Sequence, residues 1–310
     1  MRAVWVVFAV VAAALVVTGC HHTHEAPDND NGKQPDAHAE NQVKAAEAAA
    51  PGIPSAGFDK GEYVTLMHEG RVWVFAKGSD DLKSFLAGNE PAKNVSLPKA
   101  GPGGYTLRST ELSTLQGYLA ARDGFVTELV EGRIWVFRPG SEDLATFRRT
   151  GEPAKYVIRP AAGPGGMTVK APDNETLMEY LTFKPGFVTR YVDGRLWIFR
   201  PGSEDLATFE KTGEPAKHVI RPAAGPDRMT LKAPSTELIE AYMAAAEGFE
   251  TVIVEGRIWV FRPGSEELAT FRKMGEPAKY VIRPAAGPLR MTVKAPDDGT
   301  MADYLRMAVN

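Results

Sequence analysis

Short apolar and polar runs alternate along this chain, and the whole pattern returns every 62 residues. The clearest marker is an arginine, an aliphatic residue and a tryptophan, found first at Arg71-Val72-Trp73 and then three more times. A Glu-Pro-Ala-Lys segment and a tyrosine keep the same spacing, without insertion or deletion. Such a strict period predicts tandem modules that pack on their neighbours. Four modules are expected, at residues 58–122, 123–184, 185–246 and 247–310.

The second module shows the pattern of its first elements most clearly. Residues 125–130 and 133–138 are rich in β-branched and aromatic side chains, and the Glu-Gly pair between them is typical of a tight hairpin turn. Ser141 is a favourable N-cap for a helix with acidic residues in its first turn, and Gly151 is suited to end that helix. In the first module Asn89 stands in the place of Gly151, and the same left-handed conformation is expected there.

Two further strands and a second helix complete the module. The strands are expected near residues 156–159 and 167–170, and the helix starts at Pro172-Asp173. The element order is therefore ββαββα. Four antiparallel strands under two helices predict an α+β fold, in which each module is a two-layer unit. A four-bladed propeller is the alternative, which two helices per module disfavour.

Both faces of the predicted hairpin are apolar. One face carries Trp135 and Phe137 with Arg133, and the other carries Ile134 and Val136. The second face must be covered by a neighbouring module, by the other half of the same module, or by a bound partner. Because Trp and Arg are frequent anchors of interfaces, partly exposed arginine–tryptophan pairs are candidate partner-binding residues. The pairs are Arg71, Trp73, Arg133, Trp135, Arg195, Trp197, Arg257 and Trp259.

The repeats contain no recurring catalytic constellation. They lack cysteine, and neither His68 nor His218 returns at the same place in another module. Acidic pairs such as Glu142-Asp143 stand at helix starts, where the helix dipole accounts for them. The Gly-Pro-Gly-Gly loop at 163–166 precedes a strand rather than a helix, so a turn is expected rather than a phosphate cradle. We therefore expect neither an enzyme nor a cofactor.

The chain begins with a pattern that is typical of exported proteins. Arg2 precedes an apolar stretch at residues 3–17, which is too short for an ordinary membrane-spanning helix. The following segment, Val17-Thr18-Gly19-Cys20, resembles the lipobox of bacterial lipoprotein precursors. Residues 1–19 are thus predicted to be a lipoprotein signal peptide. An ordinary signal peptide followed by a chance cysteine is the alternative.

The resemblance to lipoproteins implies a covalent lipid anchor at Cys20. In that family the peptide is removed before the cysteine, whose thiol receives a diacylglycerol and whose new amine receives a further acyl chain. Several chains together make a durable anchor. The resemblance also implies an exported protein held in the cell envelope, and His21 after the cysteine favours the outer membrane over the inner one.

Residues 20–57 are predicted to form a disordered tether, because they are polar, acidic and without a hydrophobic period. Clustered imidazoles can hold zinc, copper or nickel ions, so His21, His22 and His24 are candidate metal ligands. A polar linker that is rich in histidine by chance is the alternative. Residues 132–157 are similar to the YHS/TRASH metal-handling modules, but the cysteine or histidine ligands of those modules have no counterpart here.

Charge and cysteine content narrow the function further. The 36 basic and 39 acidic residues give a net charge of −3, so no nucleic-acid partner is expected. A single cysteine excludes an internal disulfide and a cysteine-based zinc site. We expect a membrane-anchored envelope lipoprotein whose four modules form a binding or scaffolding array for an envelope protein or glycan. A periplasmic metal-handling lipoprotein and a purely structural spacer are the alternatives.

Overall fold

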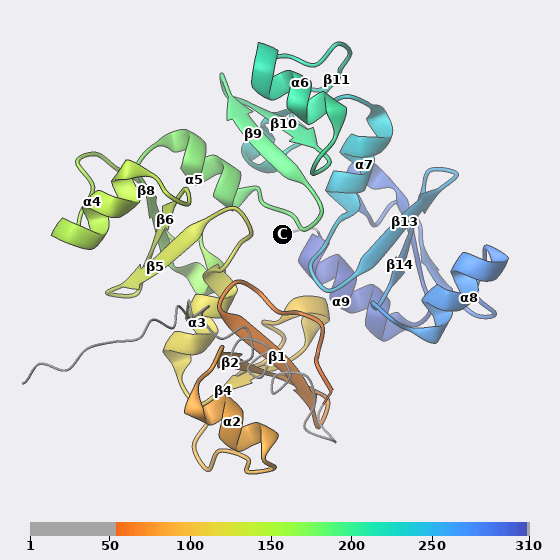
Figure 1. Cartoon of the computed structure of the whole chain (residues 1–310). Helices are drawn as coiled ribbons and strands as arrows, with labels where there is room; N and C mark the ends of the chain where they lie inside the picture. The colour runs from red at the N-terminus through yellow and green to blue at the C-terminus, as the bar shows by residue number, and fades with distance from the viewer. Residues whose placement is uncertain (1–53, 309–310) are drawn as a thin grey trace, which may run out of the picture. The chain divides into compact units, whose positions relative to one another are not determined.

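The computed structural model describes residues 54–308, which belong to one compact unit. The chain repeats the same group of strands and helices four times in this range, as the colours from orange to blue in Figure 1 show. The predicted signal peptide, Cys20, and the candidate metal ligands His21, His22 and His24 lie outside the described residues. Their assignments therefore stay predictions.

Each module consists of two strands, a helix, two short strands and a second helix, with a 3-10 turn between the short strands. The first contains β1 (Tyr63–His68), β2 (Arg71–Ala76), α2 (Asp80–Leu86), β3 (Val95–Leu97), η1 (Pro102–Gly104), β4 (Leu107–Ser109) and α3 (Leu112–Ala120). The second contains β5 (Val126–Val130), β6 (Arg133–Phe137), α4 (Glu142–Thr150), β7 (Val157–Arg159), η2 (Pro164–Gly166), β8 (Thr168–Ala171) and α5 (Asn174–Leu181). The ββαββα order and the α+β fold are confirmed.

The last two modules follow the same order. The third contains β9 (Val188–Val192), β10 (Arg195–Phe199), α6 (Glu204–Thr212), β11 (Val219–Arg221), η3 (Pro226–Arg228), β12 (Thr230–Ala233) and α7 (Thr236–Ala244). The fourth contains β13 (Glu250–Val254), β14 (Arg257–Phe261), α8 (Glu266–Met274), β15 (Val281–Arg283), η4 (Pro288–Arg290), β16 (Thr292–Ala295) and α9 (Asp298–Ala308).

The four sheets share one mixed topology. In the second module the strand order is β5-β6-β8-β7, and the central pair, β6 and β8, is parallel rather than antiparallel as expected. The reason lies in the connection. After β6, helix α4 leads into β7, which pairs antiparallel with β8, and β8 then lies beside β6 running in the same direction.

The hairpin register matches the prediction. Val130 pairs with Arg133 and Glu128 with Trp135. Both turn residues have positive φ, 50° at Glu131 and 70° at Gly132, as a two-residue turn between twisted strands requires. Sequence-local turn chemistry therefore determines which side chains share a face of each sheet.

The two helices of a module lie on opposite faces of its sheet. In the second module, Leu144 and Phe147 of α4 pack on Trp135 and Phe137. On the other face, Leu177 and Tyr180 of α5 belong to a separate cluster with Ile134 and Val136. A module thus has helix, sheet and helix layers, where two layers were expected. Both sheet faces are apolar because each is covered by a helix of the same module.

The helix ends follow the expected capping chemistry, with one exception. Ser141 Oγ accepts a hydrogen bond from the Leu144 amide at 3.3 Å, and Gly151 closes α4 with φ of 83°. The expectation for Asn89 is wrong. In the shorter first-module helix, Gly88 takes the positive φ, 90°, because α2 ends already at Leu86.

A tyrosine of each second helix ties a module to the chain that precedes it. Its hydroxyl donates to a backbone carbonyl 60 residues earlier, at the end of the previous module's second helix in three of the four cases. The bonds join Tyr118 to Phe58, Tyr180 to Ala120, Tyr242 to Thr182 and Tyr304 to Ala244, at 2.9, 2.8, 2.6 and 2.9 Å. Burial raises the pKa of these phenols, to about 12 at Tyr180.

The fourth module also contacts the first. The Gly103 amide donates to the carbonyl of Glu247 at 2.9 Å, and the Arg262 guanidinium donates to the carbonyl of Gly103 at 2.6 Å. Arg306 donates to the carbonyl of Lys99 at 3.0 Å. Contacts therefore join consecutive modules and also the last module to the first.

Candidate functional site

The four repeated tryptophans are buried inside their modules. Trp73 is 0% exposed, and Trp135, Trp197 and Trp259 are each 4% exposed. Each ring lies between its own sheet and the phenylalanine of its own first helix, as Trp135 does against Phe147 with ring centroids 5.0 Å apart. The expected partial exposure of these rings is wrong, because α2, α4, α6 and α8 cover the sheet face on which the rings lie.

A cation lies over each tryptophan, a buried lysine in three modules and a partly buried arginine in the first, which sequence reasoning did not find. Lys170 Nζ is 4.4 Å from the centre of the Trp135 ring and 4.7 Å from that of Tyr156, and the lysine is only 9% exposed. Such cation–π contacts stabilise a desolvated ammonium group. The counterparts are Lys232, Lys294 and, in the first module, Arg108. The repeated Lys-Ala-Pro segment was the signal available in the sequence.

The arginines of the same motif reach the surface. The side chains of Arg71, Arg133 and Arg257 are between 40% and 50% exposed, and Arg195 is exposed as well. Arg71 and Arg133 each pair at 3.3 Å with the glutamate of their own hairpin turn. The structure therefore separates the predicted arginine–tryptophan pairs into a surface residue and a core residue.

Exposed aliphatic side chains share a sheet face with three of these arginines. In the second module Val130 of β5 pairs with Arg133 of β6. Ile158 of β7 pairs with Lys170 of β8, which in turn pairs with Trp135, the residue two positions after Arg133. We call the valine, the arginine and the isoleucine of one module its sheet-face patch. The aliphatic members are between 39% and 49% exposed, and they are Val130, Ile158, Val192, Ile220, Val254 and Ile282.

The first module lacks this patch. His68 stands in the place of the valine and Ser96 in the place of the isoleucine. The second, third and fourth modules thus share an exposed apolar and cationic surface, and the first module carries polar side chains there. Core packing does not require the exposed Val and Ile, because the fold forms with His and Ser as well.

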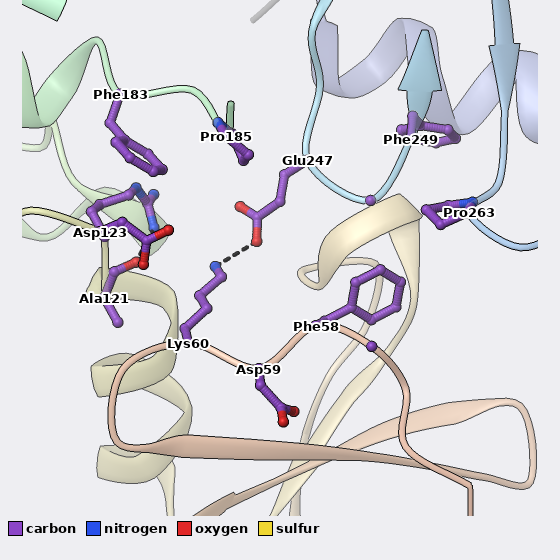
Figure 2. A pocket seen from close by; sticks show the side chains of 13 residues that line it. Phe58, Asp59, Lys60, Ala121, Asp123, Phe183, Pro185, Glu247, Phe249 and Pro263 are labelled. Carbon is purple, nitrogen blue, oxygen red and sulfur yellow. Dashed lines mark hydrogen bonds and ion pairs between the residues drawn. The ribbon is translucent and has the colours of Figure 1, made fainter. Parts of the chain in front are cut away.

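A second candidate site is a pocket of about 230 Å³, which we call the junction pocket. It is lined mainly by residues from the segments that precede the modules, and Figure 2 shows the Lys60 ammonium pointing at the Glu247 carboxylate. The two charged atoms are 2.5 Å apart. Arg122, also in the lining, donates two hydrogen bonds of 2.8 Å to carbonyls at the end of α3.

Two cations of the junction pocket and a third one beside it, Lys184, hold neighbouring modules together. Lys60, Arg122 and Lys184 occupy equivalent repeat positions, and each lies over the inter-module tyrosine of the following helix. Burial lowers the pKa of Lys60, although Glu247 opposes the shift. Because these cations already have partners within the chain, their arrangement favours a structural role for them over a catalytic one.

Lys184 predicts a measurable pH dependence of stability. Its ammonium donates to the carbonyls of Met243 and Ala245, and burial lowers its pKa from 10.5 to about 8. Between these two values the unfolded chain binds more protons than the folded one, so the free energy of unfolding should rise with pH across this window. Urea unfolding of the wild type and of Lys184→Met at several pH values measures the difference.

The rise should be smaller in Lys184→Met. The exposed lysine variant Lys217→Met is the matched control and should keep the wild-type profile. A Lys184→Met profile that is parallel to the wild type would contradict a lowered pKa at this lysine.

Within residues 54–308, no group of three or more histidine, cysteine, aspartate or glutamate side chains is arranged to hold a metal ion. In the same range no helix has the length and apolar character needed to cross a membrane. Comparison with known proteins adds no family to these findings: no protein-family model, no curated protein and no solved structure matches the chain.

Proposed function

We propose that this chain is a lipid-anchored protein of the cell envelope, whose second, third and fourth modules bind a partner protein through their sheet-face patches. The observation that carries the proposal is the exposed valine–arginine–isoleucine surface, which is present in three modules and replaced by polar residues in the first. Exposed aliphatic side chains beside a guanidinium group favour interface contacts over contacts with water.

The chemistry of the patch favours a protein over a glycan as the partner. Val130 and Ile158 offer aliphatic surface, and the large aromatic ring of the module, Trp135, is buried. Arg133 adds a cation that recognises a carboxylate of the partner. Three similar sites on one chain raise the overall affinity through effective concentration, provided that the partner engages more than one of them.

The proposed lipid anchor is at Cys20. It is supported by the resemblance of the segment Val17-Thr18-Gly19-Cys20 to a lipobox. Residues 54–57 are not part of the tether predicted at 20–57, because the Ala56 amide donates to the Thr65 carbonyl at 3.0 Å and the Met67 amide donates to the Pro54 carbonyl at 2.8 Å, so this segment pairs with β1. A tether that ends before residue 54 would place the modules at a distance from the membrane surface. The proposed location is the envelope, with the outer membrane favoured over the inner membrane.

The test is site-specific photo-cross-linking in the native host, with a photoreactive residue at Arg195 of the full chain. A defined protein adduct should form and should be lost in the triple variant Ile158→Asp, Ile220→Asp, Ile282→Asp. Met274→Asp is the matched control, because Met274 is 73% exposed but lies outside the patches. Cys20→Ala should release the protein from membranes.

A different experimental result would contradict each part of the proposal. An adduct that survives the triple variant would contradict binding through the patches, and an adduct with glycan alone would contradict a protein partner. No adduct at all would leave the module array as a structural spacer. A Cys20→Ala protein that stays with membranes would contradict lipidation.

A further inference from the structure

One repeat position of the second helix faces a position at the end of the second strand, and the pair of residues matches in charge in every module but the third. The helix position carries Gly117, Glu179, Ala241 and Asp303 in the four modules. The strand position carries Ala76, Arg138, Arg200 and Arg262. We call these two positions the acid position and the arginine position.

In the second and fourth modules a carboxylate fills the acid position and pairs with the arginine. Glu179 is 1% exposed, contacts the guanidinium of Arg138, and accepts a hydrogen bond of 2.9 Å from the Tyr191 amide of the following module. Asp303 pairs with Arg262 at 2.8 Å. Both carboxylates are thus held where a second helix meets its own sheet.

In the first module an uncharged side chain fills the space between the acid position and the arginine position. Ala76 replaces the arginine, and Tyr63 replaces the phenylalanine on which the arginines of the other modules stack. A side chain at Gly117 would collide with the Tyr63 hydroxyl. The phenol therefore occupies the space that the ion pair occupies elsewhere.

The third module has the arginine without the carboxylate. Arg200 stacks on Phe187 at 4.2 Å, as Arg138 stacks on Phe125 at 4.7 Å, so its guanidinium is placed in the same way. Ala241 provides no acid. Within residues 54–308 Arg200 makes no ion pair, and its hydrogen-bond partner is the carbonyl of Gly186 at 3.1 Å.

A groove of about 460 Å³ opens where the carboxylate is missing. Arg200 and Ala241 line it together with the apolar side chains of Leu238 and Val252. Ile253 also lines it and is the repeat equivalent of Tyr191, whose amide holds the Glu179 carboxylate in the preceding module. The groove therefore combines a guanidinium, an equivalent strand amide and apolar walls.

We propose that this groove binds a small aliphatic carboxylic acid, whose carboxylate takes at Arg200 the place that Glu179 takes at Arg138. The apolar walls hold the hydrocarbon chain. Arg200 is the single cation among the residues that line the groove, and Glu237 and Glu240 leave any further negative charge without a partner, so the ligand is a monocarboxylate. The inference is independent of the proposed function, because it concerns a seam between modules and not the sheet-face patches.

The probe is pentanoate, titrated into the full chain and followed by ligand-observed NMR. Binding in the millimolar range is expected for a ligand of this size. Arg200→Gln should weaken binding by about tenfold or more, because a charge-assisted pair is lost. Arg221→Gln removes an exposed arginine of the same module and should leave the affinity unchanged.

Ala241→Glu supplies the carboxylate from the chain itself and should abolish pentanoate binding. Pentanol, which has the same hydrocarbon chain without the charge, should bind much more weakly than pentanoate. Equal affinity of the wild type and Arg200→Gln, or undiminished binding to Ala241→Glu, would overturn the proposal. So would binding of a short glutamate-containing peptide without any binding of pentanoate, because the carboxylate would then come from a protein partner.

Discussion

Trp135→Ala should lower the free energy of unfolding by about 3–5 kcal/mol, the usual cost of removing a large buried aromatic side chain. The ring is 4% exposed and packs on Phe137, Phe147 and Tyr156. Its loss would also deprive the buried Lys170 ammonium of the ring that holds it at 4.4 Å. Chemical denaturation followed by circular dichroism measures the change.

Trp135→Phe is the control, because it keeps much of the apolar volume and should cost less than Trp135→Ala. Lys170→Met in the Trp135→Ala background should recover part of the loss, since no unpaired cation is then left buried. A Trp135→Ala protein with wild-type stability would contradict a core role for the ring. It would return this tryptophan to the list of candidate binding residues.

Tyr242→Ala should cost a similar amount, about 3–5 kcal/mol, and should weaken the coupling between modules as well. The ring is 1% exposed in the core of the third module, and its hydroxyl reaches the Thr182 carbonyl, at the end of α5, at 2.6 Å. Wild-type unfolding should be a single transition, because contacts join all consecutive modules. Tyr242→Ala should separate it into more than one, as measured by calorimetry.

Tyr242→Phe isolates the hydrogen bond from the packing. It leaves the Thr182 carbonyl buried without the phenol and should cost about 1–2 kcal/mol with a single transition retained. Tyr191→Phe, at a half-buried tyrosine outside the inter-module set, is the comparison. If Tyr242→Phe were as disruptive as Tyr242→Ala, the hydroxyl rather than the ring would be the main tie.

The candidate site could be predicted only in part. The sequence indicated that Arg133 and Trp135 share one sheet face, and the observed register agrees. Trp135 is buried and Arg133 is exposed because α4 covers Trp135 but does not reach Arg133 at the hairpin end. A face assignment follows from the alternation of side chains along a strand. Which part of that face a helix covers depends on the path of the chain between elements.

The groove beside Arg200 illustrates the same limit. The sequence shows Ala241 in the place of Glu179, but a substitution between repeats has no meaning until its partner is known. The contact between Arg138 and Glu179 joins residues 41 positions apart, on a strand and a helix of the same module. Only that contact shows that Ala241 stands where another module has a carboxylate paired with an arginine.

The sequence by itself determined the number of modules, the order of their elements, the hairpin turns and most helix caps. These features depend on side chains within a few residues of one another, such as Glu131 with Gly132 and Ser141 with Leu144. The tertiary structure alone decided that helices cover both faces of each sheet and that the fourth module contacts the first. Those outcomes rest on contacts between distant residues, such as Arg262 with Gly103, 159 positions apart, which no local pattern encodes.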